Sequence, residues 1–289
     1  MKVCAGIVLY NPDINRLKAC IEAVLPQVDR LILVDNASDN IDELQNKLNS
    51  DDFIWIKNDK NLGIATALNQ LTDYSIKNDY KWIITLDQDS ICEDGLVKKL
   101  YEAAEAAEDD KTAMVAPFII DRGIPEAENK KNTPAPETED VNFCITSGCL
   151  TNADAVADAG GFNDWLFVYD VDREICIKLL RKKYRIIRVN DAKLYHEHGL
   201  KTVTRRFLWK KITYRNYAPD SVYYMTRNLV YMLRKYGSEY APSPFKRKIR
   251  MYIAFYIKLL LEPDRNKRFK AFRKGVRDGR KVIIENKQR

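Results

Sequence analysis

The sequence of 289 residues lacks the cysteine patterns and long apolar runs that mark disulfide scaffolds and membrane-spanning chains. Its six cysteines form no C-x-x-C pair and no dense framework, so we expect reduced thiols and a cytoplasmic protein. No apolar stretch approaches the roughly 20 residues that cross a bilayer. Met1-Lys2 lead directly into a strand-like run, so we expect no signal peptide.

Two glycine-rich nucleotide-binding motifs are also missing. No G-x-G-x-x-G follows the first strand-like run, and no G-x-x-x-x-G-K-[ST] occurs anywhere in the chain. A dinucleotide-dependent oxidoreductase and a P-loop NTPase are therefore disfavoured. Histidine occurs only at positions 196 and 198, and two histidines alone make no strong metal site.

Charge is distributed unevenly, although the net charge is only +7. Residues 201–289 hold 25 lysines and arginines against 6 aspartates and glutamates, a balance of +19, and residues 1–200 hold 23 against 35, a balance of −12. We therefore predict an acidic body followed by a basic region. Such a basic region favours anionic partners, such as a membrane surface or phosphate groups.

Strand-like and helix-like segments alternate over the first part of the chain. Apolar runs predict buried strands at 3–10, 31–34, 53–56 and 82–86, and helical patterns lie between them. This alternation is typical of a mostly parallel sheet with helices on both faces. Beyond it we predict a surface loop over 121–140, strands over 141–146 and 185–189, and a helix from about 172.

Two carboxylates, Asp87 and Asp89, end the strand in the stretch WIITLDQDS. Residues two apart in an extended strand point the same way, and carboxylate oxygens suit Mg²⁺ or Mn²⁺ bridged to a diphosphate. A D-x-D pair on its own describes a solvated turn at least as well. The ligand-binding interpretation gains support because the ends of parallel strands share one edge. The other loops expected at that edge are Tyr10-Asn11, Asp35-Asn36 and Asn61-Leu62-Gly63.

Taken in order, the motifs resemble those of family 2 glycosyltransferases with the GT-A fold: IVLYNP, VDNASDN, NLGIATALNQ, TLDQDS, SGCL followed by GGF, FVYDVDREICIKL, YHEHG and SVYYMTRN. Within that family the chain is most similar to bacterial rhamnosyltransferases of polysaccharide assembly, over about residues 1–235. The resemblance implies an α/β, Rossmann-like protein with a mostly parallel central sheet flanked by helices. Residues 1–200 would form the nucleotide-sugar-binding and catalytic domain, and residues 201–289 a basic, largely helical extension.

The resemblance also implies the reaction. It predicts a metal-dependent, inverting hexosyltransferase that moves L-rhamnose from dTDP-L-rhamnose to a saccharide or lipid-linked saccharide in bacterial cell-surface polysaccharide synthesis. A UDP-hexose or UDP-galactofuranose donor is the alternative. A sugar nucleotidyltransferase is more distant, because it would show a glycine-rich basic loop where this chain has Tyr10-Asn11-Pro12-Asp13. A non-enzymatic module that binds anionic surfaces would leave the acidic edge without a purpose.

Site residues follow from the resemblance, position by position. Asp35 is expected to bind the nucleotide base, with a local turn or helix cap as the alternative. Asp89 is expected to be the metal ligand, and Asp87 to contact the ribose or the metal. His196 is expected either to support the metal or diphosphate or to be structural. Further residues expected on the nucleotide-sugar side are Tyr10, Asn11, Asn61, Gly63, Arg205 and Arg227.

The catalytic base is expected at the start of the helix near residue 172. The family pattern of acidic residues, with a basic residue four places farther on, aligns best with Asp172, Glu174 and Lys178. Asp172 is therefore the predicted base for the acceptor hydroxyl. Asp170 is the competing candidate, and a third interpretation makes Asp172 only a helix cap.

The basic region contains a segment that suits a membrane surface. Residues 245–261, FKRKIRMYIAFYIKLLL, have a basic start and an apolar body too short to span a bilayer. A helix lying on the cytoplasmic face of the inner membrane fits this pattern. A core helix or a homodimer contact is the alternative. We expect no nucleic-acid partner.

Overall fold

The computed structural model describes residues 1–48, 53–107, 111–121, 137–196, 202–207, 210–215, 217–262 and 264–283. The chain forms two compact units. The first, called the sheet unit, contains Met1–Phe167 and Val171–His198, and the second, called the helical unit, contains Val168–Asp170 and Gly199–Arg289. Three residues just before a helix of the sheet unit therefore belong to the helical unit.

Four parallel strands form one half of the main sheet, in the order β3-β2-β1-β4. Their residues are almost continuously apolar because helices cover both faces of the sheet. The strands match the four apolar runs of the sequence: β1 (Val3–Leu9), β2 (Arg30–Asp35), β3 (Phe53–Lys57) and β4 (Trp82–Asp87).

The other half of the sheet is mixed. Strand β8 (Cys149–Asn152) runs antiparallel to both β4 and its other neighbour β6 (Thr112–Asp121). Strand β9 pairs with β6 in parallel and with two short strands, β5 and β7, in antiparallel fashion. These three span Arg185–His196, Ile91–Cys92 and Thr138–Asp140. The predicted α/β class with a central sheet flanked by helices is confirmed, although only the first half is uniformly parallel.

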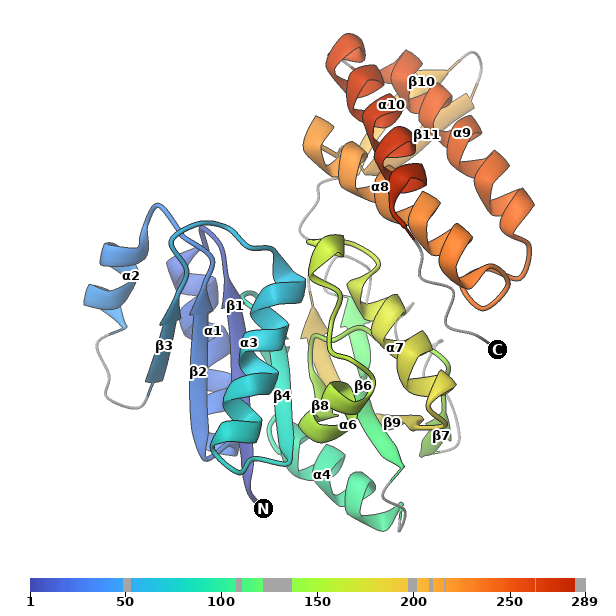
Figure 1. Ribbon diagram of the computed structural model, residues 1–289. Coiled ribbons are helices and arrows are strands. Elements are labelled where there is room, and N and C mark those ends of the chain that lie inside the picture. Colours follow the sequence, from blue (N-terminus) through green and yellow to red (C-terminus); the bar gives the residue numbers. More distant parts are fainter. Residues whose placement is uncertain are drawn as a thin grey trace. The chain divides into compact units, whose positions relative to one another are not determined.

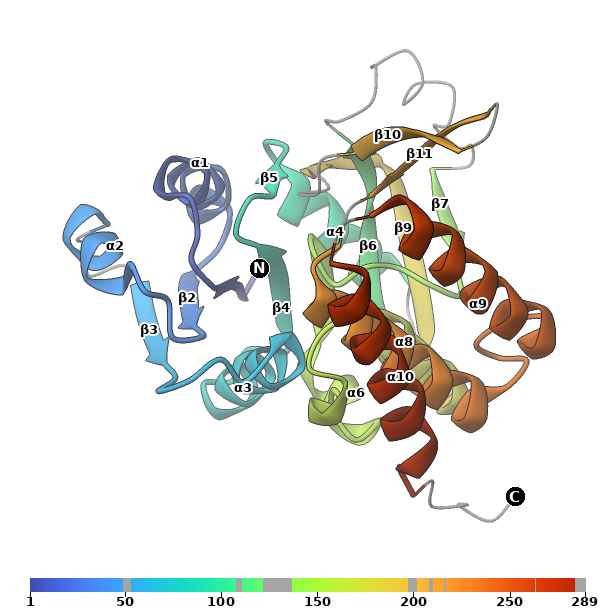
Figure 2. The same ribbon diagram turned by 90° about the horizontal axis from the view of Figure 1, so that it is seen from above.

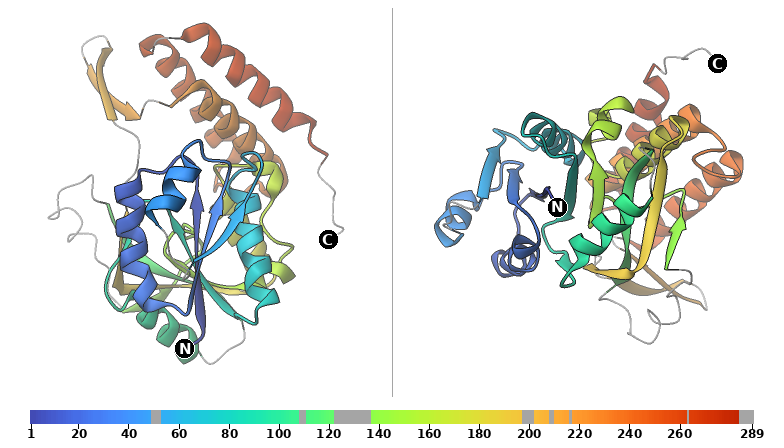
Figure 3. Two further views of the ribbon diagram at one scale, coloured as in Figure 1. Left: turned by 90° about the vertical axis from the view of Figure 1, so that its left-hand side faces the viewer. Right: turned by 90° about the horizontal axis from the view of Figure 1, so that it is seen from below.

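Helices lie on both faces of the parallel strands. Figures 2 and 3 show α1 and α3 on opposite sides of β1, β2 and β4. Helix α3 (Ile64–Lys77) shares its face with α6, whereas α1 (Ile14–Val24) contributes to the same buried cluster as α4. The other helical segments of this unit are η1 (Leu25–Gln27), α2 (Ile41–Lys47), α4 (Leu96–Ala106), α6 (Ala153–Asp158), η2 (Asp164–Leu166) and α7 (Val171–Arg181).

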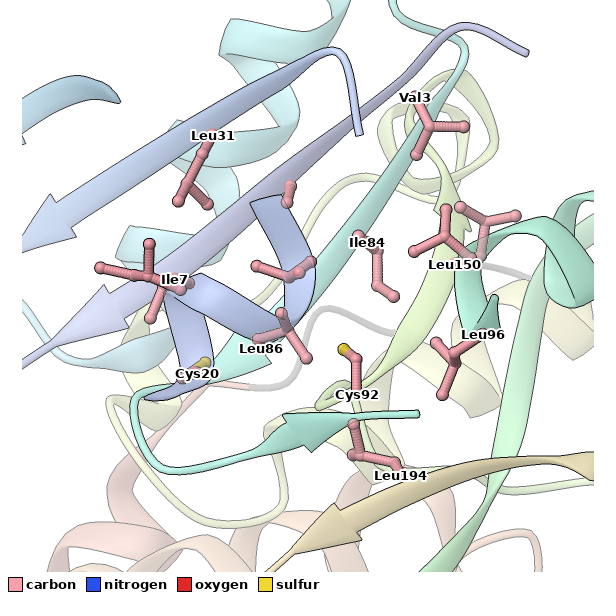
Figure 4. Packing of buried hydrophobic residues seen from close by; sticks show 14 of the residues in the cluster. Val3, Ile7, Cys20, Leu31, Ile84, Leu86, Cys92, Leu96, Leu150 and Leu194 are labelled. Atoms are coloured by element: carbon pink, nitrogen blue, oxygen red, sulfur yellow. The ribbon is translucent and has the colours of Figure 1, made fainter. Parts of the chain in front are cut away.

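The main core fills the space between the sheet and helices α1 and α4. Figure 4 shows Cys20 of α1 and Leu96 of α4 facing Ile84 and Leu86 of the central strand β4. Helix α1 begins after Asp13, whose carboxylate accepts hydrogen bonds from the first-turn backbone N–H groups of residues 15 and 16. This packing fixes the strand from which the two carboxylates emerge.

Three sequence expectations change around the second half of the sheet. The strand predicted over 141–146 is wrong, because strand pairing begins only after a turn at Gly148, where φ is +76°. The strand predicted over 185–189 continues to His196 through a shift in its pairing with β6. The last residues of the predicted loop form β7, and 122–136 lie outside the described residues.

The helical unit contains a β-hairpin and three long helices (Figure 1). Helices α8 and α10 pack so closely that a Cβ at Gly275 would lie 2.7 Å from the carbonyl oxygen of Tyr223. Among the described residues, no helix combines the length and apolar character needed to cross a bilayer. The elements are β10 (Thr202–Phe207), β11 (Lys210–Arg215), α8 (Pro219–Tyr236), α9 (Pro244–Leu261) and α10 (Arg265–Lys281).

Candidate active site

Three parallel strands end together at one edge of the sheet. Leu9 of β1 pairs with Asp35 of β2, and Val8 pairs with Asp87 of β4. The loops that follow these strands therefore begin side by side, as expected for the ligand edge of an open α/β sheet.

Asp87 stands at the centre of this edge among other carboxylates. Its side chain is 38% exposed. Burial, and then the negative charges of Asp172 and Asp89, raise the pKa of Asp87 to about 7. A hydrogen bond with Ser147 opposes this shift. The site thus concentrates negative charge that its own protein groups leave incompletely neutralised.

Asp172 reaches the same cluster from the first turn of α7. Its Oδ1 accepts hydrogen bonds from the backbone N–H of Thr146, at 3.2 Å, and from the Thr146 hydroxyl, at 2.7 Å. Burial raises the pKa of Asp172, while the hydrogen bonds from Thr146 lower it. Asp172 is the second residue of α7, one position inside the helix, so the cap-only interpretation does not describe it.

His196 joins the cluster through serine hydroxyls. Its Nδ1 lies 3.0 Å from the hydroxyl oxygen of Ser90 and 3.9 Å from Oδ2 of Asp87. The Ser90 hydroxyl is in turn 2.9 Å from that of Ser147, which accepts the Asp87 backbone N–H at 3.0 Å. The longer β9 thus brings His196 to the carboxylates, while His198 lies outside the described residues.

The residues between and beside the two aspartates hold the loop in place. Gln88 accepts the backbone N–H of Tyr10 at 2.9 Å and donates to its carbonyl at 3.4 Å. Asp89 lies 3.9 Å from a guanidinium nitrogen of Arg16, at the start of α1. Gln88 therefore ties the β4 end to the β1 end, and Tyr10 itself stays 51% exposed.

Asp35 is buried, with only 2% of its surface exposed. Its two carboxylate oxygens lie 3.2 and 3.3 Å from the backbone nitrogen of Ser38, which is the local turn that the sequence left as the alternative. The Ser38 hydroxyl accepts the backbone N–H of Asn11, and the Asn11 side chain bonds Asp39. These contacts tie the loop after β1 to the loop after β2.

The structure gives a steric reason for the glycine at position 63. The chain adopts φ +84° there, and a Cβ would lie 2.5 Å from the ring and carbonyl of Phe167. The next residue, Ile64, donates its N–H to the same carbonyl at 2.7 Å. Close approach of Phe167 accounts for glycine here, and a contact of Gly63 with a nucleotide stays a prediction. Asn61 caps the turn by accepting the Gly63 N–H.

Two side chains fix the glycine pair that precedes α7. Lys178 donates to the carbonyl oxygens of Gly160 and Gly161, which both have positive φ. Asn69 of α3 accepts the backbone N–H of Phe162 and donates to its carbonyl. The basic residue of the family pattern therefore anchors the loop that leads to the proposed base.

Asp170 has surroundings different from those of Asp172. Its Oδ1 accepts the hydroxyl of Tyr240 at 2.9 Å, and both residues belong to the helical unit. Burial, and then the charge of Asp170, raise the pKa of Tyr240. Of the two competing aspartates, Asp172 is the one beside Asp87.

The two predicted arginines also belong to the helical unit. Arg227 is 7% exposed, and its guanidinium lies 4.9 Å from the ring centre of Tyr224. Its Nε donates to Oδ1 of Asn228 at 2.9 Å. Arg205 is exposed on the hairpin strand β10. Arg227 is thus built into helix packing, and a phosphate role for either arginine stays a prediction.

The carboxylates fit a metal ion only in part. Among the described residues, no group of three or more histidine, cysteine, aspartate or glutamate side chains is arranged to hold one. Mg²⁺ is commonly held by one or two carboxylates together with substrate phosphates, so it does not need a complete protein cage. Burial, and then the negative charges of Asp172 and Asp89, raise the pKa of Asp87, and a bound cation would oppose both effects. Asp87 and Asp89 therefore fit a cation that a diphosphate completes.

Sequence reasoning missed the residues that position this site. Thr146, Ser90 and Gln88 hold the carboxylates and their loop. Asn228, which belongs to the SVYYMTRN motif, holds the segment before α7. Thr146 lies directly before the motif SGCL, and Ser90 is the last residue of TLDQDS. Both motifs were interpreted through their glycines and aspartates. The polar character of Thr146 and Ser90 within otherwise buried stretches was the available clue, since buried hydroxyls normally have partners.

Comparison with known proteins gives a family match and a curated relative. A family model described as "Glycosyl transferase family 2" matches residues 4–157. Over 282 residues the chain is 28% identical to the dTDP-rhamnosyl transferase RfbF of Shigella flexneri, covering 92% of this chain and 90% of the relative.

Two solved structures are similar in fold. One is S. aureus TarS 1-349 in complex with UDP, with a TM-score of 0.57, 13% identity, and coverage of 99% of this chain and 95% of that chain. The other is GalNAc-T7 with UDP, GalNAc and Mn2+, with a TM-score of 0.57, 13% identity and coverage of 96% of this chain. This chain spans only 56% of the GalNAc-T7 chain.

Proposed function

The chain belongs to glycosyl transferase family 2, and from this premise we propose that it transfers L-rhamnose from dTDP-L-rhamnose to a saccharide or lipid-linked saccharide. The protein is a glycosyltransferase. The similarity to RfbF, over at least 90% of both chains, supports the donor. The setting proposed is bacterial cell-surface polysaccharide synthesis in the cytoplasm.

One observation carries the proposal: Asp87, at the end of the parallel strand β4, is close enough to Asp172 for the charge of Asp172 to raise its pKa. In the proposed reaction Asp172 is the general base. Thr146 fixes Oδ1, and Oδ2 takes the proton of the acceptor hydroxyl. The raised pKa of Asp172 makes it a better proton acceptor than an ordinary aspartate.

The step is a single displacement. The acceptor oxygen bonds to the anomeric carbon while the bond from that carbon to the nucleoside diphosphate breaks, so the configuration inverts. Asp172 holds the proton, and the diphosphate leaves with the electron pair. Asp89 and Asp87 would hold Mg²⁺ or Mn²⁺, which offsets the charge of the leaving group. His196, bonded to Ser90, supports the Asp87 side of this cluster.

Donor-side residues divide by exposure. Tyr10 and Asn11 are exposed and are proposed to contact the nucleotide directly. Asp35, Asn61 and Gly63 are engaged in turns, and we propose that they shape the loops that receive it. Arg205 and Arg227 remain the proposed phosphate-side residues of the helical unit.

A UDP-linked hexose is the second candidate donor, because the solved relatives of similar fold contain UDP. A donor screen distinguishes the candidates. dTDP-L-rhamnose, UDP-glucose, UDP-galactofuranose and UDP-N-acetylglucosamine are each tested for Mn²⁺-dependent hydrolysis and for a rise in melting temperature. We expect the largest effects with dTDP-L-rhamnose and their loss in Asp89→Ala.

The exposed Asp94→Ala serves as the matched control and should behave as wild type. Stabilisation by a UDP-sugar alone would transfer the assignment to the second candidate. Failure of every nucleotide sugar, with or without Mn²⁺, would overturn the proposed donor class.

A further inference from the structure

Helix α9 buries little of its apolar surface. Its sequence, PFKRKIRMYIAFYIKLLL, is dominated by apolar and aromatic residues, yet Phe255 is the one buried residue among its 18. Isolated exposed apolar residues are ordinary on protein surfaces, but several of them on one helix call for a partner.

The exposed apolar residues of α9 form one stripe. Their spacing of four, four, three and four places them on the same face of the helix. Each exposes at least two-fifths of its surface: Phe245 73%, Ile249 41%, Ile253 54%, Tyr256 49% and Leu260 55%. We call these five residues the α9 stripe.

A groove adjoins the stripe and shares Tyr256 with it. Its aromatic walls come from α9 and α10, namely Tyr252, Tyr256, Phe269 and Phe272. Its other lining residues are Val276 and four basic residues, Arg273, Arg277, Arg280 and Lys281, with no acidic residue among them. Apolar and aromatic surface beside concentrated positive charge is the composition of a membrane-interface site.

The charge around the stripe points to an anionic partner. Lys246, Lys248 and Arg250 are exposed on the first turns of α9, close in sequence to Phe245 and Ile249. Residues 201–289 as a whole carry 25 basic against 6 acidic residues. Each lysine or arginine near an anionic membrane strengthens binding about fivefold, from about 1 kcal/mol per charge.

The geometry points to a helix that lies along the surface. At 1.5 Å per residue, 18 residues give a length of about 27 Å. The basic residues at its start and the two exposed aromatic rings within the stripe suit burial of one face only. No helix among the described residues meets the requirements for spanning a bilayer.

We propose that the α9 stripe and the adjoining groove dock the protein on an anionic lipid bilayer, with the apolar side chains in the interface and the groove's basic residues on lipid phosphates. This proposal develops the membrane-surface interpretation of residues 245–261. It does not depend on which sugar donor the enzyme uses or on which residue is the catalytic base. A membrane site would bring the enzyme to the surface on which a lipid-linked acceptor is presented.

Two other occupants fit less well. A second copy joined by a two-fold axis would bring the same basic residues of both chains together, which like charges oppose. A nucleic acid would match the charge but leave the apolar stripe uncovered. The test therefore separates burial of the stripe from attraction by charge.

The experiment uses the full chain and vesicles without any nucleotide sugar. Co-sedimentation is measured with phosphatidylcholine vesicles and with vesicles that also contain phosphatidylglycerol, and the oligomeric state is measured by light scattering. We expect binding to the phosphatidylglycerol vesicles only. Because no sugar donor is present, failure here leaves the proposed transferase reaction untouched, and failure of the donor screen leaves this result untouched.

Matched variants test the two parts of the surface. Ile249→Ser with Ile253→Ser should weaken vesicle binding by about tenfold or more, because two exposed apolar side chains are lost from the interface. Arg273→Gln with Arg280→Gln should weaken it by about twenty-fivefold and reduce its salt dependence. Ile76→Ser, at a residue of α3 that is 38% exposed, is the control and should bind as wild type.

Three outcomes would overturn the proposal. Equal binding to both kinds of vesicle would remove the role of lipid charge. Loss of binding in the arginine variant but not in the isoleucine variant would show attraction without burial of the stripe. A wild-type dimer that the isoleucine variant converts to a monomer, without vesicle binding by either, would assign the stripe to a second copy.

Discussion

Asn228 on α8 donates a hydrogen bond from Nδ2 to the carbonyl oxygen of Val168, at 2.6 Å, although the two residues are 60 positions apart. The same amide donates to the carbonyl of Tyr169 at 2.9 Å. Phe167, Tyr169 and Asp170 all have positive φ, near +60°, which is costly for residues other than glycine. Asn228 thus stabilises a strained segment immediately before the helix of the proposed base.

Replacing Asn228 with alanine should free both carbonyls and relax this segment. We expect unfolding to become easier by about 2 kcal/mol, because the carbonyl oxygens of residues 168 and 169 lose their hydrogen-bond donor. The rate of transfer should fall by about tenfold while the affinity for donor is unchanged, since Asp172 would lose its position. Asn266→Ala, at an exposed position of α10, is the control and should change neither quantity. A loss of stability with a normal transfer rate would limit Asn228 to a structural role.

The two aspartates before and inside α7 should separate in kinetic tests. Asp172→Asn should keep donor binding and lower transfer by about 100-fold or more, because no carboxylate would remain to accept the proton. Asp170→Asn should keep most of the transfer activity, since Asp170 bonds Tyr240 instead. The measurements are turnover with an acceptor and nucleotide affinity by calorimetry. The reverse ranking of the two variants would transfer the base to Asp170.

Asp87→Asn should stabilise the protein when divalent cations are chelated. The folded state raises the pKa of Asp87 from 3.8 to about 7, so it binds this proton more tightly than the unfolded state. Wild type therefore loses stability relative to the variant as the pH rises from about 4 to about 7. With screening at a side chain that is 38% exposed, the gain should be about 1 kcal/mol, or a few degrees in melting temperature.

Melting curves from pH 4 to 8 in the presence of EDTA test this. Asp94→Asn, which changes an exposed carboxylate, should give a difference from wild type that does not vary with pH. A difference that is also constant with pH for Asp87→Asn would mean that folding does not raise the pKa of Asp87.

Gly63→Ala and Gly95→Ala form a pair that separates backbone strain from crowding. Both glycines have positive φ, but a Cβ at Gly63 would meet Phe167, whereas a Cβ at Gly95 would meet nothing within 4 Å. Gly95→Ala should cost about 1 kcal/mol, and Gly63→Ala about 3 kcal/mol or more. Urea unfolding at a fixed protein concentration provides the values. Similar losses of stability at the two positions would mean that Phe167 moves away from the added Cβ at little energetic cost.

Lys178→Gln tests the anchor of the glycine pair. Two carbonyl oxygens would lose a charged donor, so we expect a loss of about 1–2 kcal/mol. Lys182→Gln breaks an exposed ion pair with Asp158, at 3.1 Å, and should cost less than about 0.5 kcal/mol. Chemical denaturation compares the two variants. Equal losses of stability in the two variants would mean that the hydrogen bonds of Lys178 contribute no more than an exposed ion pair.

The parallel half of the fold was predictable because its strands are short, apolar and buried on both faces. Residues 82–86 are such an apolar run, and Asp87 ends the strand at the sheet edge. Strand β8 was misplaced because the segment before it is also rich in β-prone residues. There the turn at Gly148 and the bonds made by Thr146 decide the path of the chain.

The carboxylates were predictable as residue types, but their supports were not. Thr146 reaches Asp172 across 26 positions and Ser90 reaches His196 across 106, and no local pattern encodes such pairs. Gly63 shows the same limit. The loop was predicted from the sequence, but the residue that a Cβ at Gly63 would meet is Phe167, far along the chain.

The three-residue excursion Val168–Asp170 has a consequence for recombination between related enzymes. A chimera that exchanges only the residues after 198 would combine α8 of one enzyme with residues 168–170 of the other. The hydrogen bonds from Asn228 to residues 168 and 169 would then form only by chance. Successful exchanges should transplant residues 168–170 together with the C-terminal part. The same constraint applies in evolution, so residues 168–170 and Asn228 should be inherited together.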